Sequence, residues 1–387
     1  MNEIIGSNQS IARIFNNRLV LNQLKEKPMS GTELADKLSL SNATVSSILR
    51  SLLSSGIIQV CHSDENINAK GRKRVTYCIN QDYGLILVFS ITSYHSHPVI
   101  CNMLGENLYE SDHEIRNYSL SVFQDEISKV QEVLKRSVFK NIPIRSVIIS
   151  LPGLVNQKTG DLQVSPQFDK DLFSNSHTMV SLFSEAFSCP VQLENDTKLM
   201  MMAELANGTF NQGNAGMLAY IDYGIGGAFE FDNQLYWGAR GYAGEIGRLV
   251  VKVENESHHL DDFASLRVLQ DKVSKKKGEL LSVSKIYELY NQNDSDVVEE
   301  VKLGARSVGK ALKEIIRVFD IEQFVLSGGI VNFGDTYLDI VKEEVKAANE
   351  NATVVFSNNG NYAICDGAKE MGISTVLSYV LDSLKNQ

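Results

Sequence analysis

Apolar and polar residues alternate at helical spacing through the first part of the chain. The segment 10–26 predicts one helix, which ends before Pro28 because proline disfavours helical geometry in the residue before it. Ser30 and Glu33 have the spacing of a capping box, so a second short helix is expected to begin there. Ser41 is expected to cap a third helix. The apolar positions of this third helix form one buried stripe: Val45, Ile48, Leu49 and Leu52.

The polar residues of the third helix lie on its other faces. Together with the cap, they are Ser41, Asn42, Thr44, Ser46, Ser47 and Arg50. Short polar groups and one long cation suit base edges and phosphates in a major groove. The alternative interpretation is a solvated face on a three-helix bundle. The order of a capped short helix, a three-residue turn and a polar-faced helix favours a helix-turn-helix.

A basic loop between two strand-like runs follows this helix. The runs cover residues 56–60 and 74–79, and the loop ends in Lys70, Gly71, Arg72, Lys73 and Arg74. Gly71 allows the backbone to approach a phosphate or to enter a minor groove. A charged loop is often only solvated, but this one adjoins a recognition-like helix. Residues 1–80 therefore predict a winged helix-turn-helix domain that binds double-stranded operator DNA.

The rest of the chain, residues 81–387, alternates strands and helices and contains a hint of duplication. Residues 85–110 predict three strands joined by turns, and residues 217–237 repeat this scheme. Each half later contains a strand that runs into a glycine-bearing loop, at 147–153 and at 324–329. Two similar α/β lobes of this kind enclose a cleft in which small ligands tend to bind.

Charge divides the chain in the same place. The net charge is −10, but residues 1–80 hold 10 basic and 6 acidic residues, so the first part carries +4 and the remainder −14. A basic head on an acidic body is typical of a protein whose head binds a polyanion.

The five cysteines are scattered and form no CxxC pair, which predicts neither a disulfide framework nor a thiolate metal site. We therefore expect a reducing, cytoplasmic environment. The chain opens without the pattern of a secretory signal, and its longest apolar run, residues 85–91, is far shorter than the roughly 18 residues that span a bilayer. No membrane partner is expected.

Five segments of the body carry a family resemblance. In order, they read SLPGLVNQKTGDLQVSP, LENDTKLMMMAELANG, IDYGIGGAFE, GYAGEIG and FVLSGG. This series resembles the sugar-binding ROK family, named for repressor, open reading frame and kinase. The head is similar to that of the family's xylose and N-acetylglucosamine repressors, including ATVSS and the basic GRK segment. The resemblance covers essentially the whole chain and implies an actin-like, ribonuclease H-like sugar-kinase fold. Lobe I would comprise residues 81–195 plus the C-terminal helix, and lobe II residues 196–370.

The resemblance also implies a set of ligand-binding residues. They are Gly153, Asn195, Asp196, Glu245, Arg248 and Asp261. In ROK sugar kinases the Asn-Asp pair binds sugar hydroxyls, and its aspartate is the general base. The alternative is that Asp196 and Thr197 merely cap a helix that begins near Lys198. Arg248 replaces a family histidine. It suits an anionic ligand such as a sugar phosphate, or it forms a surface ion pair with Glu245 or Asp261.

Departures from the kinase pattern bear on catalysis. Ser90 stands where ROK kinases have the aspartate that serves Mg²⁺ and phosphate, and Asp222-Tyr223 replaces Gly-Thr in the second phosphate motif. A carboxylate at that point should repel a nucleotide. The histidine and the cysteines of the family's zinc module are missing from the segment that follows GEIG. These differences predict no catalysis, with Asp196 as a vestigial base, and neither a cofactor nor a metal.

The sequence therefore predicts a transcriptional repressor of carbohydrate metabolism, controlled by a sugar or sugar phosphate and acting as a homodimer or tetramer. Two other hypotheses stay open. One is an ATP-dependent ROK sugar kinase that also binds DNA, and the other is a regulator whose body serves only for dimerisation. The sequence does not identify the sugar or the operator.

Overall fold

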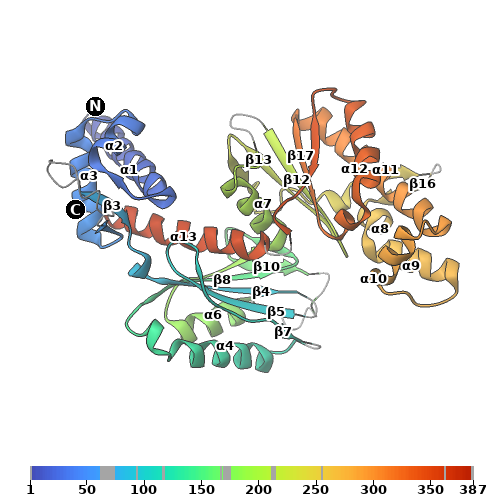
Figure 1. Ribbon diagram of the computed structural model, residues 1–387, viewed down its shortest axis with the longest axis horizontal. Coiled ribbons are helices and arrows are strands. Elements are labelled where there is room, and N and C mark those ends of the chain that lie inside the picture. Colours follow the sequence, from blue (N-terminus) through green and yellow to red (C-terminus); the bar gives the residue numbers. More distant parts are fainter. Residues whose placement is uncertain are drawn as a thin grey trace, which may run out of the picture.

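The computed structural model describes residues 2–61, 75–92, 95–115, 118–165, 168, 176–210, 215–253, 256–360 and 363–384. Figure 1 shows a small helical head and two larger units, each built on a β-sheet. Within the described ranges, every helix is too short or too polar to cross a membrane.

Three helices form most of the head, as the sequence predicts: α1 (Asn2–Glu26), α2 (Gly31–Leu38) and α3 (Asn42–Ser55). The capping box is confirmed, because the Glu33 N–H donates to the Ser30 hydroxyl at 3.3 Å and the Ser30 N–H donates to the Glu33 carboxylate at 2.8 Å. Ser41 caps α3, and the predicted stripe of that helix is buried. Three residues separate α2 from α3, which confirms the helix-turn-helix arrangement.

A three-stranded antiparallel sheet completes the head in the order β1-β3-β2. Its strands are β1 (Met29–Ser30), β2 (Ile58–Cys61) and β3 (Thr76–Ile79). The two predicted wing strands are therefore present. The predicted tip of the wing, formed by Lys70, Gly71, Arg72, Lys73 and Arg74, lies outside the described residues.

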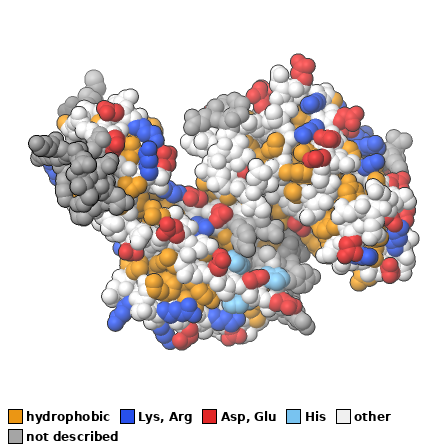
Figure 2. All heavy atoms as spheres, viewed as in Figure 1, with side chains coloured by type: hydrophobic (Ala, Val, Ile, Leu, Met, Phe, Trp, Pro, Cys, Tyr) orange, Lys and Arg blue, Asp and Glu red, His pale blue; other side chains and the backbone are white. Residues whose placement is uncertain are grey.

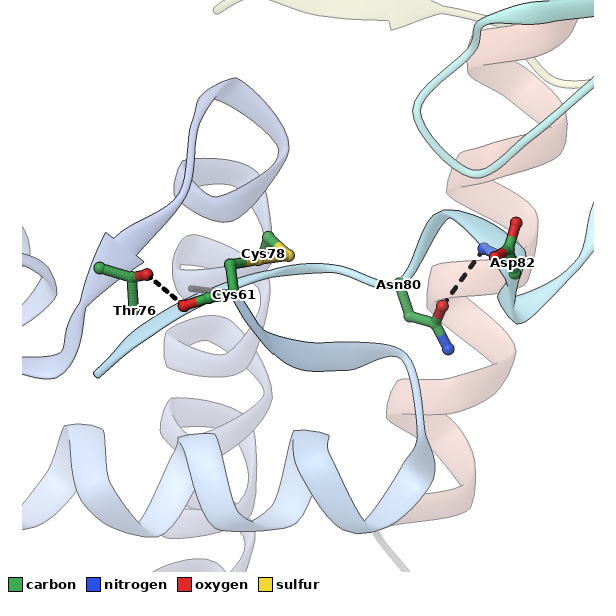
Figure 3. Close-up of a disulfide and its surroundings, with 5 residues drawn as sticks. All are labelled: Cys61, Thr76, Cys78, Asn80 and Asp82. Carbon is green, nitrogen blue, oxygen red and sulfur yellow. Dashed lines mark hydrogen bonds between the residues drawn. A yellow bond between two sulfur atoms is a disulfide. The ribbon is translucent and has the colours of Figure 1, made fainter. Parts of the chain in front are cut away.

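A disulfide joins the two wing strands, so the prediction of no disulfide is wrong. Cys61 and Cys78 are bonded, with their Cα atoms 6.1 Å apart (Figure 3). The strand register pairs Gln59 with Cys78 and Cys61 with Thr76, so the two cysteines are diagonal neighbours on one face of the ladder. Their separation of 17 residues gave no sign of this proximity. The other three cysteines are free and buried.

The two larger sheets have the same connectivity. The first has the order β11-β8-β4-β5-β6, with the short β7 (His113–Glu114) also paired to β5. Its main strands are β4 (Leu85–Ile91), β5 (His95–Cys101), β6 (Asn107–Glu110), β8 (Ile144–Leu151) and β11 (Val191–Asn195). The second has the order β18-β17-β12-β13-β14. Its strands are β12 (Ala215–Ile221), β13 (Ile225–Phe231), β14 (Gln234–Tyr236), β17 (Gln323–Ser327) and β18 (Thr353–Phe356). Each sheet is an antiparallel three-strand meander extended by two parallel strands, which supports the predicted duplication.

Helices cover both sheets. The first sheet packs on one face against α4 (Leu120–Leu134) and α6 (Ser176–Phe187), and on the other against the C-terminal helix α13 (Ala363–Ser383). Helix α7 (Asp196–Ala206) contacts both sheets and lies along α13. The second sheet is covered by α8 (Asp261–Ala264), α9 (Leu266–Lys277), α10 (Val283–Asn291), α11 (Ser295–Phe319) and α12 (Gly334–Lys346). Short hairpins and 3₁₀ turns connect these elements: β9 (Leu154–Asn156), β10 (Asp161–Val164), β15 (Val250–Val253), β16 (Glu256–His259), η1 (Gln81–Tyr83), η2 (Ser137–Phe139), η3 (Ile246–Arg248) and η4 (Gly329–Phe333).

The head is docked on α13. One buried apolar cluster contains Leu21 and Leu24 of α1, Ile373 and Val380 of α13, and Ile86 of β4. An ion pair between Lys25 and Glu370 adds a polar contact between the two helices. Figure 1 shows α13 running from the head towards α7, and Figure 2 shows an open notch between the head and the unit of the second sheet. Helix α13 therefore packs directly against the head.

Candidate functional site

The predicted DNA-binding residues that the structure describes lie on α3 and at its N-cap. Asn42, Ser46, Ser47 and Arg50 are exposed there, whereas Thr44 is half-buried. The Ser41 and Thr44 hydroxyls are 2.8 Å apart, and the Thr44 N–H donates to the Ser41 hydroxyl at 3.1 Å. Ser41 and Thr44 thus form the N-terminal cap of α3. The four exposed side chains extend from the helix into solvent.

A hollow of about 480 Å³ lies beside this face. It is lined by the start of α2, by α3 and by the residues around β3, namely Ser30, Gly31, Thr32, Asn42, Ser46, Leu49, Arg50, Leu53, Val75 and Tyr77. One cation and several short hydrogen-bonding groups therefore border a single concave surface. Such a surface suits nucleic acid, in which phosphate contacts fix the position and base-edge contacts give specificity.

The second candidate site begins where β11 meets α7. Asn195 is the N-cap of α7, since its side-chain oxygen accepts from the Lys198 N–H at 3.3 Å. Its amide nitrogen donates to the Gly153 carbonyl at 2.9 Å. Gly153 has a φ of 147°, and a Cβ there would lie 2.5 Å from the Val164 carbonyl oxygen, so only glycine fits. The capping role proposed for Asp196 and Thr197 thus belongs to Asn195.

Asp196 faces a cavity of about 260 Å³ between the two sheets. The lining combines two carboxyl groups, several hydroxyls and a few apolar side chains: Ser90, Ile91, Thr92, Ser150, Pro152, Asp196, Tyr220, Asp222, Tyr223, Gly224 and Ile364. Burial raises the pKa of Asp196; hydrogen bonds from Thr197 oppose this, and the nearby Asp222 charge adds to it. Carboxylates and hydroxyls together can exchange hydrogen bonds with a polyol.

Glu245, Arg248 and Asp261 are close enough to act on one another electrostatically. Arg248 is 4.0 Å from the Glu245 carboxylate and its side chain is 67% exposed, which matches the surface-pair alternative. The Asp261 carboxylate accepts from the Ile225 N–H at 2.7 Å. Burial raises the pKa of Glu245, while Lys198 and Arg248 lower it and Asp196 raises it. The surroundings of Asp196 are therefore predominantly acidic.

Asp222 joins two loops of the second sheet. Its carboxylate accepts from the Gly329 N–H at 3.0 Å and from the Tyr220 hydroxyl at 3.4 Å. Its other oxygen accepts from the Tyr223 N–H at 2.8 Å. The Asp222 side chain thus links the turn after β12 to the loop after β17 through hydrogen bonds. An acidic side chain at this point disfavours a phosphate at the same position.

The sequence interpretation missed two groups at this site. Glu194 is buried at the end of β11, where it accepts from the Gln157 amide and from the Asn195 N–H. Lys198 is buried in the first turn of α7 and donates to the Ala243 carbonyl. The available signal was the motif LENDTK, which places Glu194 and Lys198, of opposite charge, between a strand-like run and an apolar helix.

The sequence model of the ROK family matches residues 103–369, well over half of the chain. The chain belongs to the ROK family. A second model, described as a bacterial regulatory protein of the arsR family, matches residues 17–60, which contain the helix-turn-helix.

Relatives of this ROK protein include regulators and kinases. It is 23% identical to a xylose repressor from Caldicellulosiruptor bescii, over 96% of this chain and 98% of the repressor. A crystal structure of a ROK family transcriptional regulator, a homologue of the Escherichia coli MLC protein, matches with a TM-score of 0.80 at 19% identity, over 98% and 100% of the chains. A ROK glucokinase from Streptomyces griseus, in complex with glucose and AMPPNP, matches with a TM-score of 0.60 at 18% identity, over 74% and 99%. The fold of nearly the whole chain, head included, thus matches that of the ROK family regulator.

Proposed function

We propose that this protein is a DNA-binding repressor of sugar metabolism whose affinity for its operator is set by a small sugar. The observation that carries the proposal is the exposed face of α3, with Arg50 and three short polar residues beside a hollow of about 480 Å³. The full-length similarity to a xylose repressor supports the same function, because it extends through the head. Residues 1–80 would be the DNA-binding domain and residues 81–387 the sugar-binding domain. Lobe I of that domain would span 81–195 plus the C-terminal helix, and lobe II 196–370.

The sugar would bind at the acidic cavity beside Asp196. Asp196 and Asp222 border it together with the hydroxyls of Ser90 and Ser150, so a neutral sugar could donate hydroxyl hydrogens to carboxylates. A sugar phosphate would bring negative charge into the same surroundings, and Arg248 is largely exposed and next to Glu245. We therefore favour a neutral sugar as the effector, with Gly153, Asn195, Glu245, Arg248 and Asp261 as further candidates for binding it.

Helix α7 would transmit the effect of the ligand. It starts at the cavity with Asp196, it packs along α13, and α13 carries the head. Movement of α7 upon sugar binding would change the position of the head, and paired heads in a homodimer or tetramer would then match a palindromic operator differently. DNA binding also implies a cytoplasmic location.

Gel-shift titration tests this function. DNA from upstream of the protein's own gene should form a specific, salt-sensitive complex, and either D-xylose or D-glucose should change its stability. If no specific complex forms with that DNA, the proposal is lost.

A kinase activity is the second candidate, because Asp196 occupies the position of the family's general base. We infer that phosphoryl transfer has been lost, for two reasons. Ser90 provides no carboxylate for a metal ion, and the Gly329 N–H, in the loop after β17, already donates to the Asp222 carboxylate. A coupled assay of ADP release with ATP, Mg²⁺ and the same sugars should show no turnover. Turnover that disappears in Asp196→Asn would establish the kinase instead.

A further inference from the structure

Lys198 is a buried cation at the edge of the proposed sugar site. It follows Asp196 by two residues in the first turn of α7, and only 3% of it is exposed. Its ammonium group donates to the Ala243 carbonyl, which belongs to the loop that precedes Glu245. Burying an ammonium group costs free energy unless hydrogen bonds and opposite charges compensate for the lost water. The Ala243 carbonyl is one such partner.

Two carboxyl groups from different elements act on this ammonium. They are Glu194, at the end of β11, and Glu245, two residues beyond Ala243 in the chain. Burial lowers the pKa of Lys198 to about 8, and both carboxyls oppose that shift. Asp196 and Arg248 act in turn on Glu245. Lys198 therefore connects the strand that leads to Asn195 with the loop that carries Glu245.

The loop itself is closely fitted at two glycines on either side of Ala243. A Cβ at Gly244 would lie 2.1 Å from the Gly227 carbonyl oxygen, and one at Gly241 would lie 2.7 Å from the Gln157 side chain. The Gln157 N–H also donates to the Arg240 carbonyl at 3.0 Å. Both glycines have left-handed φ values, 92° and 95°, so the loop has a specific path over the turn between β9 and β10 and over β13. Lys198 contacts the middle of that path.

We infer that Lys198 is a positioning residue, which fixes the loop 240–245 so that the Glu245 carboxyl faces the same ligand as Asp196. This inference rests on the proposed sugar site. Without the ammonium, the Ala243 carbonyl loses its buried donor and Glu245 loses its attraction to α7. The loop would then open more often, and the sugar would lose Glu245 as an additional carboxylate acceptor.

Hydrogen exchange of the ligand-free protein tests the inference independently of any sugar. In Lys198→Met, which keeps the length of the side chain, peptides covering 238–247 should exchange at least about tenfold faster, a factor typical for loss of a charged hydrogen bond. The exposed Lys310 on α11 provides the matched control, and Lys310→Met should leave the exchange of these peptides unchanged. Unchanged exchange of 238–247 in Lys198→Met would overturn the inference.

Two further readouts separate a positioning role from a general loss of fold. In the wild-type protein, protection of 238–247 should decrease as pH rises through about 8, because Lys198 then loses its charge. This loss needs no variant, so it decides the question even if Lys198→Met folds poorly. Constant protection across that range would contradict the role of the ammonium.

Calorimetry then connects Lys198 to the effector. Titration with D-xylose and D-glucose should give a Kd at least about tenfold weaker in Lys198→Met than in Lys310→Met. An equal Kd in both variants would contradict a role in ligand binding. If the wild-type protein binds neither sugar, the proposed effector class fails, whereas the exchange experiment still decides what Lys198 does to the loop.

Discussion

The Cα of Gly367 lies directly over the backbone of Leu199. A Cβ on Gly367 would be 1.7 Å from the Leu199 carbonyl oxygen, far inside any van der Waals contact. Gly367 belongs to α13 and Leu199 to α7, so the two helices touch backbone to backbone three residues after Asp196. Since protein interiors are close-packed, a displacement of α7 cannot be absorbed at this contact and must move α13, which carries the head.

Gly367→Ala should therefore destabilise the protein and weaken the link between sugar and DNA. Forcing a methyl group against a backbone carbonyl should lower the free energy of unfolding by about 1–3 kcal/mol, measured by urea denaturation. Gly304 is the matched control, because it also lies within a helix, α11, and a Cβ there meets nothing within 4 Å. Gly304→Ala should be neutral or stabilising by up to about 1 kcal/mol. Equal stabilities of the two variants would contradict the close contact.

Arg50→Ala should weaken operator binding and reduce its dependence on salt. Arg50 is exposed on α3 beside the hollow, so it can reach a phosphate or a base edge. Loss of one phosphate contact should lower the slope of log K against log salt by about 1, measured by fluorescence anisotropy. Arg317 is an exposed arginine on α11 that is paired with Glu314, so Arg317→Ala controls for net charge and should leave the slope unchanged. A wild-type slope in Arg50→Ala would exclude α3 as the recognition surface.

The local sequence signals predicted the head and the sheets well. The capping box at Ser30, the cap at Ser41 and the buried stripe of α3 follow from interactions within a few residues, and the structure has all three. The position of Asp196 beside a cavity was inferred from family resemblance. In contrast, the Cys61–Cys78 bond, the Lys198 contact with Ala243 and the Gly367 contact with Leu199 depend on strand register and on helix packing over long separations. No periodicity along the chain encodes such contacts.

The free energy of unfolding should decrease as pH rises from about 5 to 8, because Glu194 is buried. Burial raises the pKa of this carboxyl from 4.5 to about 7, so the native state holds the proton more tightly than the unfolded chain does. Between these two pKa values the native state binds more protons, and the free energy of unfolding falls as pH increases. The change attributable to Glu194 is at most about 3 kcal/mol. Urea denaturation at pH 5 and pH 8 should show a smaller decrease for Glu194→Gln than for wild type; an identical decrease would show that Glu194 is not the group responsible.

Thiol labelling should distinguish Cys61 and Cys78 from the remaining cysteines. Protein purified without reductant, denatured and treated with iodoacetamide should take up label at Cys101, Cys189 and Cys365 only. Prior reduction should add label at Cys61 and Cys78, as mass spectrometry of peptides would show. Full labelling of all five without reduction would contradict the bond between β2 and β3.

Operator binding with and without sugar, in the wild-type protein and in Asp196→Asn, tests the central claim most directly. Fluorescence anisotropy with DNA from upstream of the gene should give a specific Kd that changes in the presence of D-xylose or D-glucose for the wild type. Asp196→Asn keeps the helix cap on Asn195, so it should bind the DNA with wild-type affinity and lose the response to sugar. The account would be contradicted if the wild-type protein formed no specific complex with upstream DNA. It would also be contradicted if Asp196→Asn kept the full response to sugar.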